Sequence, residues 1–182
     1  MIFETTPLAG LCVLEPRVFG DERGFFLESW NAASFREAGF DLNFVQDNHS
    51  RSAGGILRGL HYQTEQTQGK LVRVTSGAVF DVAVDLRRSS ATLGQWFGLE
   101  LSASNHRMLW VPPGFAHGFY VLSEFADFQY KCTDYYHPAS EVSLAWDDPN
   151  LDIHWPLVAG APPALSAKDA AGRRWGDIPL FD

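Results

Sequence analysis

Short stretches of alternating apolar and polar residues recur along this chain, and they limit its possible folds more than any other feature. In the clearest stretch, residues 78–87, the apolar series Ala78, Phe80, Val82, Val84 and Leu86 alternates with Val79, Asp81, Ala83, Asp85 and Arg87. A period of two is typical of a β-strand with one face on a core and the other face polar or small.

Similar strand patterns occupy residues 11–18, 25–30, 44–52, 55–63, 70–74, 92–101, 108–111, 119–122 and 127–136, with frequent Gly and Pro between them. A short helix is predicted from the capping residue Asn31 to Gly39, and one more helical turn near Ser166. Many short strands with few helices predict an all-β, antiparallel sandwich or barrel rather than βαβ units.

The length of 182 residues suits one domain, residues 1–182, with a Pro- and Ala-rich C-terminal tail, about 156–182, packed on it. The formal charge of −8 disfavours nucleic acid or an anionic membrane as the partner, although clustered cations could still bind a small anion.

The spacing of the cysteines and the length of the apolar runs indicate where in the cell the protein is expected. Cys12 and Cys132 lie far apart without a CxxC pattern, so neither a disulfide framework nor a zinc–thiolate site is predicted. The chain shows no signal-peptide pattern and no apolar run of membrane-spanning length, so we expect a cytoplasmic protein without membrane contact.

Cationic and titratable residues stand in the strand pattern of residues 55–74, including His61 and Lys70. Burying such groups costs stability unless they face a cleft, so we expect a cleft here. A single histidine on a strand is more often structural than catalytic, and His61 gains weight only from its neighbours.

The segment Pro112-x-Gly114-x-x-His117 matches the second motif of the cupins, and the chain resembles that superfamily. Metal-binding cupins place His, His, Glu and His at positions that here hold His61, Gln63, Lys70 and His117. Because a protonated lysine cannot ligate a cation, no metal or other cofactor is expected, and Lys70 would stabilise an oxyanion or enolate in its place.

A narrower resemblance covers nearly the whole chain, in order. The sequence is similar to the dTDP-4-dehydrorhamnose 3,5-epimerases in the blocks DERGFFLE (21–28), QDNHS (46–50), LRGLHYQ (57–63), GKLVR (69–73), DVAVDLR (81–87), PGFAHGF (113–119), YKCT (130–133), WDDP (146–149) and SAKD (166–169). The resemblance implies a cupin-type jelly roll, a homodimer and epimerisation of a dTDP-linked 4-keto sugar at C3 and C5 without a cofactor.

The resemblance also implies catalytic roles: His61 as the base, Lys70 beside the enolate, Tyr130 as the acid, and Asp169 orienting His61. Two simpler explanations stay open. Asp169 follows Ser166 at the spacing of a capping box, and Tyr130 could be an ordinary strand aromatic.

For the substrate, the resemblance implies an aromatic residue that stacks on the thymine base, and Tyr136 shares the face of Tyr130 if the strand continues. It implies further binding residues at Arg23, Arg58 and Lys168 for the diphosphate, and at Glu28, Gln46, Asn48, His117 and Glu141 for polar contacts.

One spacing conflicts with a regular strand. Arg58 and His61 are three residues apart, so an unbroken ladder would point them to opposite faces. We expect a bulge or similar irregularity at Gly59 that turns both toward the cleft.

Other functions remain compatible with the scaffold: an epimerase that acts at one carbon only or on another nucleotide-linked keto sugar, and a non-catalytic sugar-nucleotide binding protein. A metal-dependent cupin oxygenase is disfavoured by Gln63 and Lys70.

Overall fold

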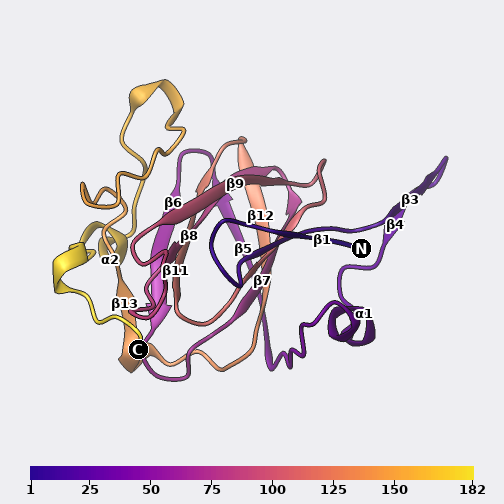
Figure 1. Cartoon of the computed structure of the whole chain (residues 1–182). Helices are drawn as coiled ribbons and strands as arrows, with labels where there is room; N and C mark the ends of the chain where they lie inside the picture. The colour runs from indigo at the N-terminus through magenta and orange to yellow at the C-terminus, as the bar shows by residue number, and fades with distance from the viewer.

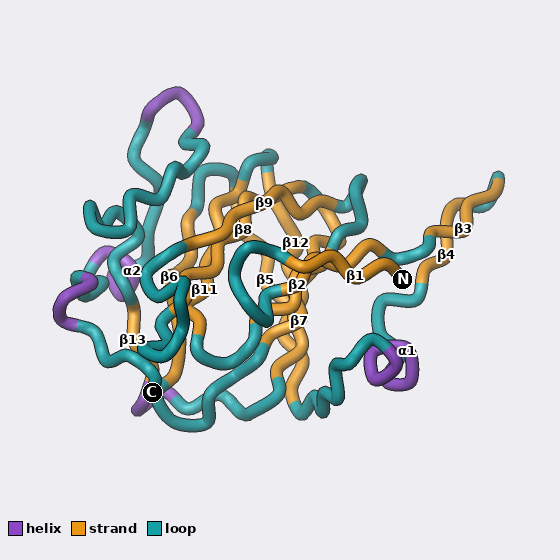
Figure 2. The backbone as a smooth tube through the Cα atoms, in the orientation of Figure 1, coloured by secondary structure: helices purple, strands orange, loops and turns teal.

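Two antiparallel sheets face each other in the computed structural model, which describes the backbone of residues 1–182 and every side chain except that of residue 159. Figure 1 shows the two layers, and Figure 2 shows that the helices lie at the periphery. The larger sheet has the order β1 (Ile2–Thr5), β2 (Cys12–Glu15), β10 (Met108–Val111), β7 (Lys70–Ser76), β12 (Phe125–Cys132) and β5 (Gln46–Ala53).

The smaller sheet has the order β13 (Glu141–Ser143), β6 (Leu57–Gln63), β11 (Phe115–Val121), β8 (Ala78–Asp85) and β9 (Trp96–Ser102). The helical elements are short: α1 (Ala32–Glu37), α2 (Ala167–Ala170), η1 (Pro138–Ser140), η2 (Val158–Gly160) and η3 (Trp175–Asp177). The prediction of an all-β antiparallel sandwich with a few short helices is confirmed. None of the helices in the described chain is long and apolar enough to cross a membrane.

The two predicted helix starts are also confirmed. The side chain of Asn31 accepts hydrogen bonds from the backbone N–H groups of Ala33 and Ser34, which caps α1. The side chain of Ser166 accepts a hydrogen bond from the N–H of Asp169 and caps α2 in the same way.

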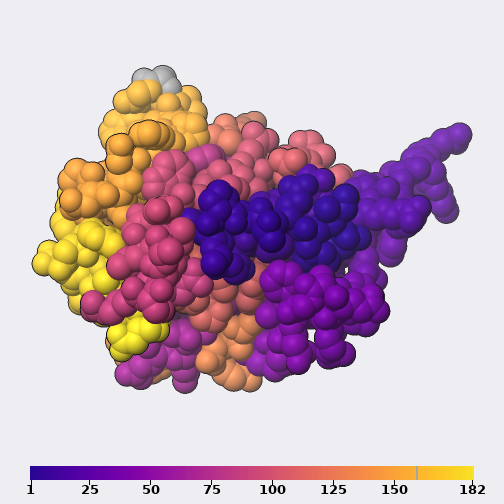
Figure 3. Space-filling view, in the orientation of Figure 1, coloured from indigo at the N-terminus to yellow at the C-terminus, as the bar shows by residue number. Residues whose placement is uncertain are grey.

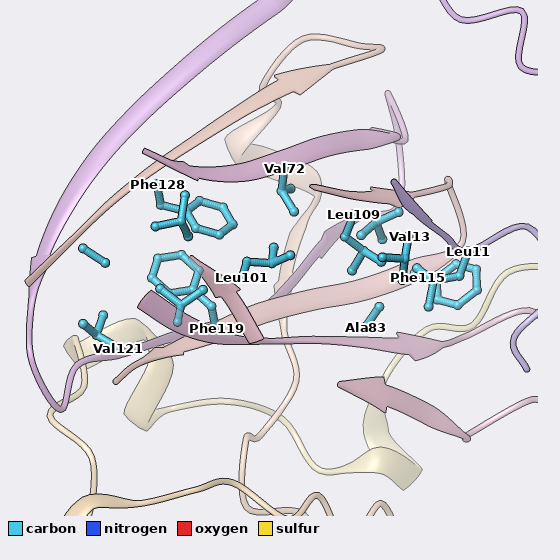
Figure 4. Packing of buried hydrophobic residues seen from close by; sticks show 14 of the residues in the cluster. Leu11, Val13, Val72, Ala83, Leu101, Leu109, Phe115, Phe119, Val121 and Phe128 are labelled. Carbon is cyan, nitrogen blue, oxygen red and sulfur yellow. The ribbon is translucent and has the colours of Figure 1, made fainter. Parts of the chain in front are cut away.

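The main core lies between the sheets, where side chains from both layers point toward one another (Figure 4). It includes Val72 and Phe128 from the larger sheet and Ala83, Leu101 and Phe119 from the smaller one. Because alternate residues of these strands point inward, one row of apolar side chains on each strand is enough to build this layer.

Each sheet also has a covered outer face. Residues near the C-terminus, among them Ile178 and Phe181, pack on the outer face of the smaller sheet, and the hydroxyl of Tyr62 donates to the carbonyl of Pro179 at 2.7 Å. The segment around Phe35 packs on the outer face of the larger sheet.

A hairpin of β3 (Val18–Asp21) and β4 (Gly24–Leu27) projects away from both sheets (Figures 1 and 3). Its side chains Phe19, Phe25 and Phe26 are exposed. An apolar patch on a projecting arm is typical of a surface that another molecule covers.

Several strand boundaries differ from the predictions. The strand predicted for 11–18 ends at Glu15, before Pro16. β1 and β13 lie where no strand was expected, and β3 begins at Val18, the last residue of the predicted strand, and continues to Asp21. The strand predicted for 119–122 begins earlier, at Phe115, and the strand predicted for 127–136 ends at Cys132.

Candidate active site

A cleft of about 640 Å³ opens between the two sheets, next to the main core. Phe119 and Phe128, whose rings stack at 4.2 Å, belong to the core and also line the cleft. The cleft brings together most of the residues predicted for the site: Gln46, Asn48, Arg58, His61, Lys70, His117, Tyr130, Tyr136, Glu141, Lys168 and Asp169.

His61 and Asp169 form a close pair on one wall. Nε2 of His61 lies 2.5 Å from Oδ1 of Asp169, and the two side chains are 22% and 4% exposed. The other carboxylate oxygen accepts a hydrogen bond from the hydroxyl of Ser166 at 2.7 Å. Asp169 therefore lies in the first turn of a capped helix and also contacts His61, so the two interpretations of its position are compatible.

The environment of Asp169 favours its ionised form. Burial raises the pKa of this carboxyl, but the hydrogen bonds from His61 and Ser166 outweigh burial and hold the pKa below its usual range. A buried carboxylate that contacts one ring nitrogen of a histidine fixes the orientation of the ring and supports a proton on it.

Lys70 and Tyr130 belong to the opposite wall, on neighbouring strands of the larger sheet, β7 and β12. Burial lowers the pKa of Lys70, while the attraction of Cys132, Glu141 and Asp81 acts in the other direction. Burial raises the pKa of Tyr130, so its hydroxyl keeps its proton at neutral pH.

His117 pairs with Asp81, a residue that was not among the predicted site residues. Nε2 of His117 lies 2.9 and 3.1 Å from the two carboxylate oxygens of Asp81, and both residues are buried. His117 is also directly opposite His61 in the β11–β6 ladder. The signal that could have identified it is an acidic residue in the middle of a strand whose neighbours Phe80 and Val82 are apolar.

The strand β6 is irregular at Gly59, as predicted. His117 is paired with His61 but Phe119 with Arg58, so β6 holds one more residue than β11 across this interval. Gly59 has φ +117°, a conformation that favours glycine, and a Cβ on it would lie 2.6 Å from Cα of Gly118.

Because of this bulge, Arg58 turns into the same cleft as His61. Its guanidinium donates from Nε to the hydroxyl of Ser52 at 2.8 Å and from Nη2 to the carbonyl of Arg51 at 3.4 Å. The group is thereby held in place with part of its planar fork still open to an anion.

Amide side chains of β5 follow the predicted period of two. Nε2 of Gln46 donates to Oδ1 of Asn48 at 3.1 Å, and Nδ2 of Asn48 donates to the sulfur of Cys132 at 3.5 Å. Both amides line the cleft.

A chain of hydrogen bonds forms the rim. The hydroxyl of Tyr136 donates to one carboxylate oxygen of Glu141 at 2.9 Å, and Nζ of Lys168 donates to the other at 2.8 Å. Tyr136 lines the cleft, as predicted, and Tyr135 is exposed outside it. The predicted reason was wrong, because β12 ends at Cys132 and strand alternation does not reach Tyr136.

Two predicted binding residues lie outside the cleft. Arg23 is in the turn of the projecting hairpin and pairs with Asp21 at 2.5 Å, and Glu28 accepts a hydrogen bond from Asn31 at 3.1 Å. In the chain as described, neither lines the cleft.

Sequence reasoning also missed several residues that line the cleft. They are small or apolar residues, or residues of loops, for which a sequence pattern carries little signal: Ser50, Gln68, Phe119, Phe128, Leu165 and Ser166.

The position of the second cupin metal ligand is taken by Gln63, whose amide is already bonded to the backbone. Its Nε2 donates to the carbonyls of Gln66 at 2.8 Å and Tyr135 at 3.1 Å, and its Oε1 accepts from the N–H of His137 at 3.0 Å. Among the described residues, no three His, Cys, Asp or Glu side chains are grouped so as to hold a metal ion.

Comparison with known proteins identifies the family. The family model described as dTDP-4-dehydrorhamnose 3,5-epimerase matches residues 5–177. The chain belongs to the dTDP-4-dehydrorhamnose 3,5-epimerase family. The predicted resemblance is thereby confirmed, and with it the cupin-type jelly roll.

Members of this family align over nearly the full length. A dTDP-4-dehydrorhamnose 3,5-epimerase of Pseudomonas aeruginosa is 60% identical over 93% of this chain and 93% of its own length. A crystal structure of a dTDP-6-deoxy-D-glucose-3,5-epimerase from Legionella pneumophila, in complex with dTDP-4-keto-L-rhamnose, has a TM-score of 0.95 and 55% identity, covering 99% of this chain and 97% of that one.

The family fold also supports a narrower activity. A 3'-monoepimerase from Streptomyces bikiniensis, in complex with dTDP-quinovose, has a TM-score of 0.88 and 33% identity, covering 94% of this chain and 86% of that one.

Proposed function

We propose that this chain inverts C3 and C5 of dTDP-4-dehydro-6-deoxy-D-glucose by enolisation and gives dTDP-4-dehydro-L-rhamnose, a step of dTDP-L-rhamnose biosynthesis. The observation that carries the proposal is the placement of His61 and Tyr130 on opposite walls of one cleft. A sugar ring between the two sheets would have a base on one face and an acid on the other, as inversion of a carbon requires.

In the first step, His61 accepts a proton from a carbon next to the C4 ketone. The electron pair of the broken C–H bond forms a carbon–carbon double bond, and the carbonyl electron pair moves to oxygen to give an enolate. The ammonium of Lys70 stabilises the negative oxygen, and Asp169 stabilises the imidazolium of His61.

In the second step, Tyr130 gives its proton to the same carbon from the opposite face, and the ketone forms again. Exchange of protons with solvent then restores neutral His61 and protonated Tyr130. Because C3 and C5 both neighbour the C4 ketone, the same groups can act on each carbon in turn, and the atoms and charges balance without a cofactor.

The rest of the cleft suits a nucleotide. Arg58 and Lys168 provide cations for the diphosphate, and Tyr136 provides a ring for the thymine base. Gln46, Asn48, His117 and Glu141 are the polar groups proposed to bind the remaining parts of the substrate.

We also propose a homodimer in which the β3–β4 hairpin of one copy reaches the cleft of the other. The exposed Phe25 and Phe26 would be covered by this contact, and Arg23 and Glu28 would join the partner's cleft. A cytoplasmic location is consistent with Cys12 and Cys132, which are both unpaired.

Solvent deuterium incorporation into dTDP-4-keto-6-deoxyglucose, followed position by position, tests the function. Exchange with inversion at C3 and C5 is the expected result. Exchange at one position alone would select a monoepimerase, and nucleotide binding without exchange would select the non-catalytic alternative.

A further inference from the structure

The segment that carries Tyr136 has no regular secondary structure, yet side chains of neighbouring strands and loops hydrogen-bond to its backbone. Residues 133–137 lie between the end of β12 and η1. Three glutamine side chains hold four consecutive residues of this segment: Gln68 donates to the carbonyl of Asp134 at 2.9 Å, Gln63 to that of Tyr135 at 3.1 Å, and Gln46 and Gln63 accept from the N–H groups of Tyr136 and His137 at 2.9 and 3.0 Å.

Gln63 is the centre of this arrangement, because among the described side chains it alone hydrogen-bonds to the backbone on both sides of Tyr136. Its side chain is 5% exposed and does not line the cleft. It also donates to the carbonyl of Gln66, a residue with φ +49°. A non-glycine residue in that conformation is strained, so this hydrogen bond helps to hold the β6–β7 loop in place.

Only a neutral amide satisfies all these partners. The carbonyls of Tyr135 and Gln66 need a donor, and the N–H of His137 needs an acceptor. An ionised glutamate offers no donor and would bury a charge, and an apolar side chain of the same size offers neither group.

The position of Gln63 links the two parts of the site. It lies on β6 two residues after His61, and its backbone is paired with Glu141, which accepts the hydrogen bond of the Tyr136 hydroxyl. One side chain thus ties the strand of the base to the segment of the aromatic ring.

We propose that Gln63 is a positioning residue for nucleotide recognition, which holds the ring of Tyr136 in its binding position before the ligand arrives. The inference rests on the proposed function, because it takes the thymine base of a dTDP-sugar as the ligand of Tyr136. Preorganisation of this kind strengthens binding by removing the cost of ordering the segment.

The test compares wild type with Gln63→Met, which keeps the size of the side chain, and Gln63→Glu, which keeps one acceptor. Because the ring of Tyr136 would no longer be held ready to stack on the base, both variants should raise KM for the dTDP-sugar and Kd for dTDP by roughly tenfold. The kcat at saturation should stay within about twofold of wild type, because His61, Lys70 and Tyr130 do not depend on this segment.

A matched control is Gln95→Met. Gln95 is exposed and lies just before β9, on the far edge of the smaller sheet, so KM, Kd and kcat should not change. In a Tyr136→Ala background, Gln63→Met should change Kd by less than about twofold, because the ring that it positions is gone.

Amide hydrogen exchange of the wild-type protein provides a measurement that needs no variant. The N–H groups of Tyr136 and His137 should be protected without ligand, and dTDP should add little protection. Rapid exchange without dTDP followed by strong protection with it would overturn the proposal, as would an unchanged Kd in folded Gln63→Met or an equal effect in the Tyr136→Ala background.

The outcomes separate this inference from the proposed function. Wild-type protein that neither exchanges substrate protons nor binds dTDP refutes the function. Active wild-type protein with unaltered KM and Kd in the Gln63 variants refutes the positioning role alone.

Discussion

Nε2 of His61 lies 2.5 Å from Oδ1 of Asp169, although the two residues are 108 positions apart in the chain. The strand β6 provides the histidine, and the single turn of α2 provides the carboxylate, which the hydroxyl of Ser166 holds from the other side. This contact points one ring nitrogen of His61 at the carboxylate, and the other nitrogen is the one to which the proposed mechanism assigns the substrate proton.

The variant Asp169→Asn tests the contact. An amide cannot stabilise the imidazolium and can select the wrong tautomer, so kcat should fall by roughly 10²–10⁴-fold while KM changes little. Steady-state kinetics measure this effect. The exposed pair of His154 and Asp152 offers a matched control: Asp152→Asn should leave kcat unchanged, and a kcat for Asp169→Asn within tenfold of wild type would contradict the assignment.

Loss of the Tyr130 hydroxyl should separate proton removal from proton return. In Tyr130→Phe, His61 can still form the enolate, so deuterium exchange should continue while the inverted product forms at least about 10²-fold more slowly. Nuclear magnetic resonance of the sugar in D₂O follows both rates. Tyr135→Phe, outside the cleft, serves as the control, and an undiminished rate of inversion in Tyr130→Phe would exclude this hydroxyl as the acid.

The exposed aromatic side chains of the β3–β4 hairpin lead to a prediction about the proposed dimer. Replacing both Phe25 and Phe26 by Ser should weaken the proposed dimer by about 10²-fold or more, because large aromatic side chains dominate interface energies. Light scattering coupled to gel filtration measures the mass across concentrations. Leu93→Ser, another exposed apolar site, should leave the mass unchanged, and a wild-type protein that is monomeric at micromolar concentration would refute the dimer.

The buried carboxylate of Asp85 should make the free energy of unfolding depend on pH. Burial raises the pKa of this carboxyl, but hydrogen bonds from Arg87, Ser90 and Thr92 outweigh burial and hold the pKa at about 2. Because the pKa is lower in the folded state than in the unfolded state, the carboxylate stabilises the fold above about pH 4, and this contribution is lost as the pH falls toward 2.

We therefore expect Asp85→Asn to lower the free energy of unfolding by roughly 2 kcal/mol at pH 7 and to flatten its decline between pH 4 and 2. Urea titrations at several pH values measure both effects. The exposed Asp41→Asn is the control, and parallel pH profiles for Asp85→Asn and wild type would contradict the prediction.

Gly59 should tolerate no side chain. In Gly59→Ala, the new Cβ would meet Cα of Gly118 at 2.6 Å and the carbonyl oxygen of His117 at 2.8 Å, in a strained backbone conformation. The free energy of unfolding should fall by about 2–5 kcal/mol. Thermal and urea unfolding measure the loss, whereas Gly176→Ala, where a Cβ meets nothing within 4 Å, should cost far less; equal costs would contradict this account.

The sequence was sufficient for the fold class because the alternation of side chains marks each strand, and apolar rows are visible in residues such as Val72 and Val82. It did not show which row faces the other sheet: Val82 packs on the outer face, and Val79 and Ala83 of the same strand lie between the sheets. Strand ends were less predictable. β12 stops at Cys132 although a strand was predicted as far as Tyr136, because the next residues bond to glutamine side chains instead of to a neighbouring strand.

Site residues that lie in a family motif were predictable from the sequence. Residues whose place in the site depends on tertiary contacts were not. The pairing of Asp81 with His117 became visible only when β8 and β11 were placed side by side, and the contact of Ser52 with Arg58 depends on the bulge. Arg23 and Glu28 remain predictions, because their place in a site depends on a second copy of the chain.

The bulge at Gly59 changes how β6 should be compared with related sequences. It shifts the alternation of side chains by one residue. An even-numbered residue, Arg58, faces the cleft before Gly59, and an odd-numbered residue, His61, faces it after Gly59. A change that straightened β6 at Gly59 without altering its length would leave His61 in register and rotate Arg58 to the outer face. The proposed anion binding could then be lost in evolution without disturbing the groups proposed to transfer protons.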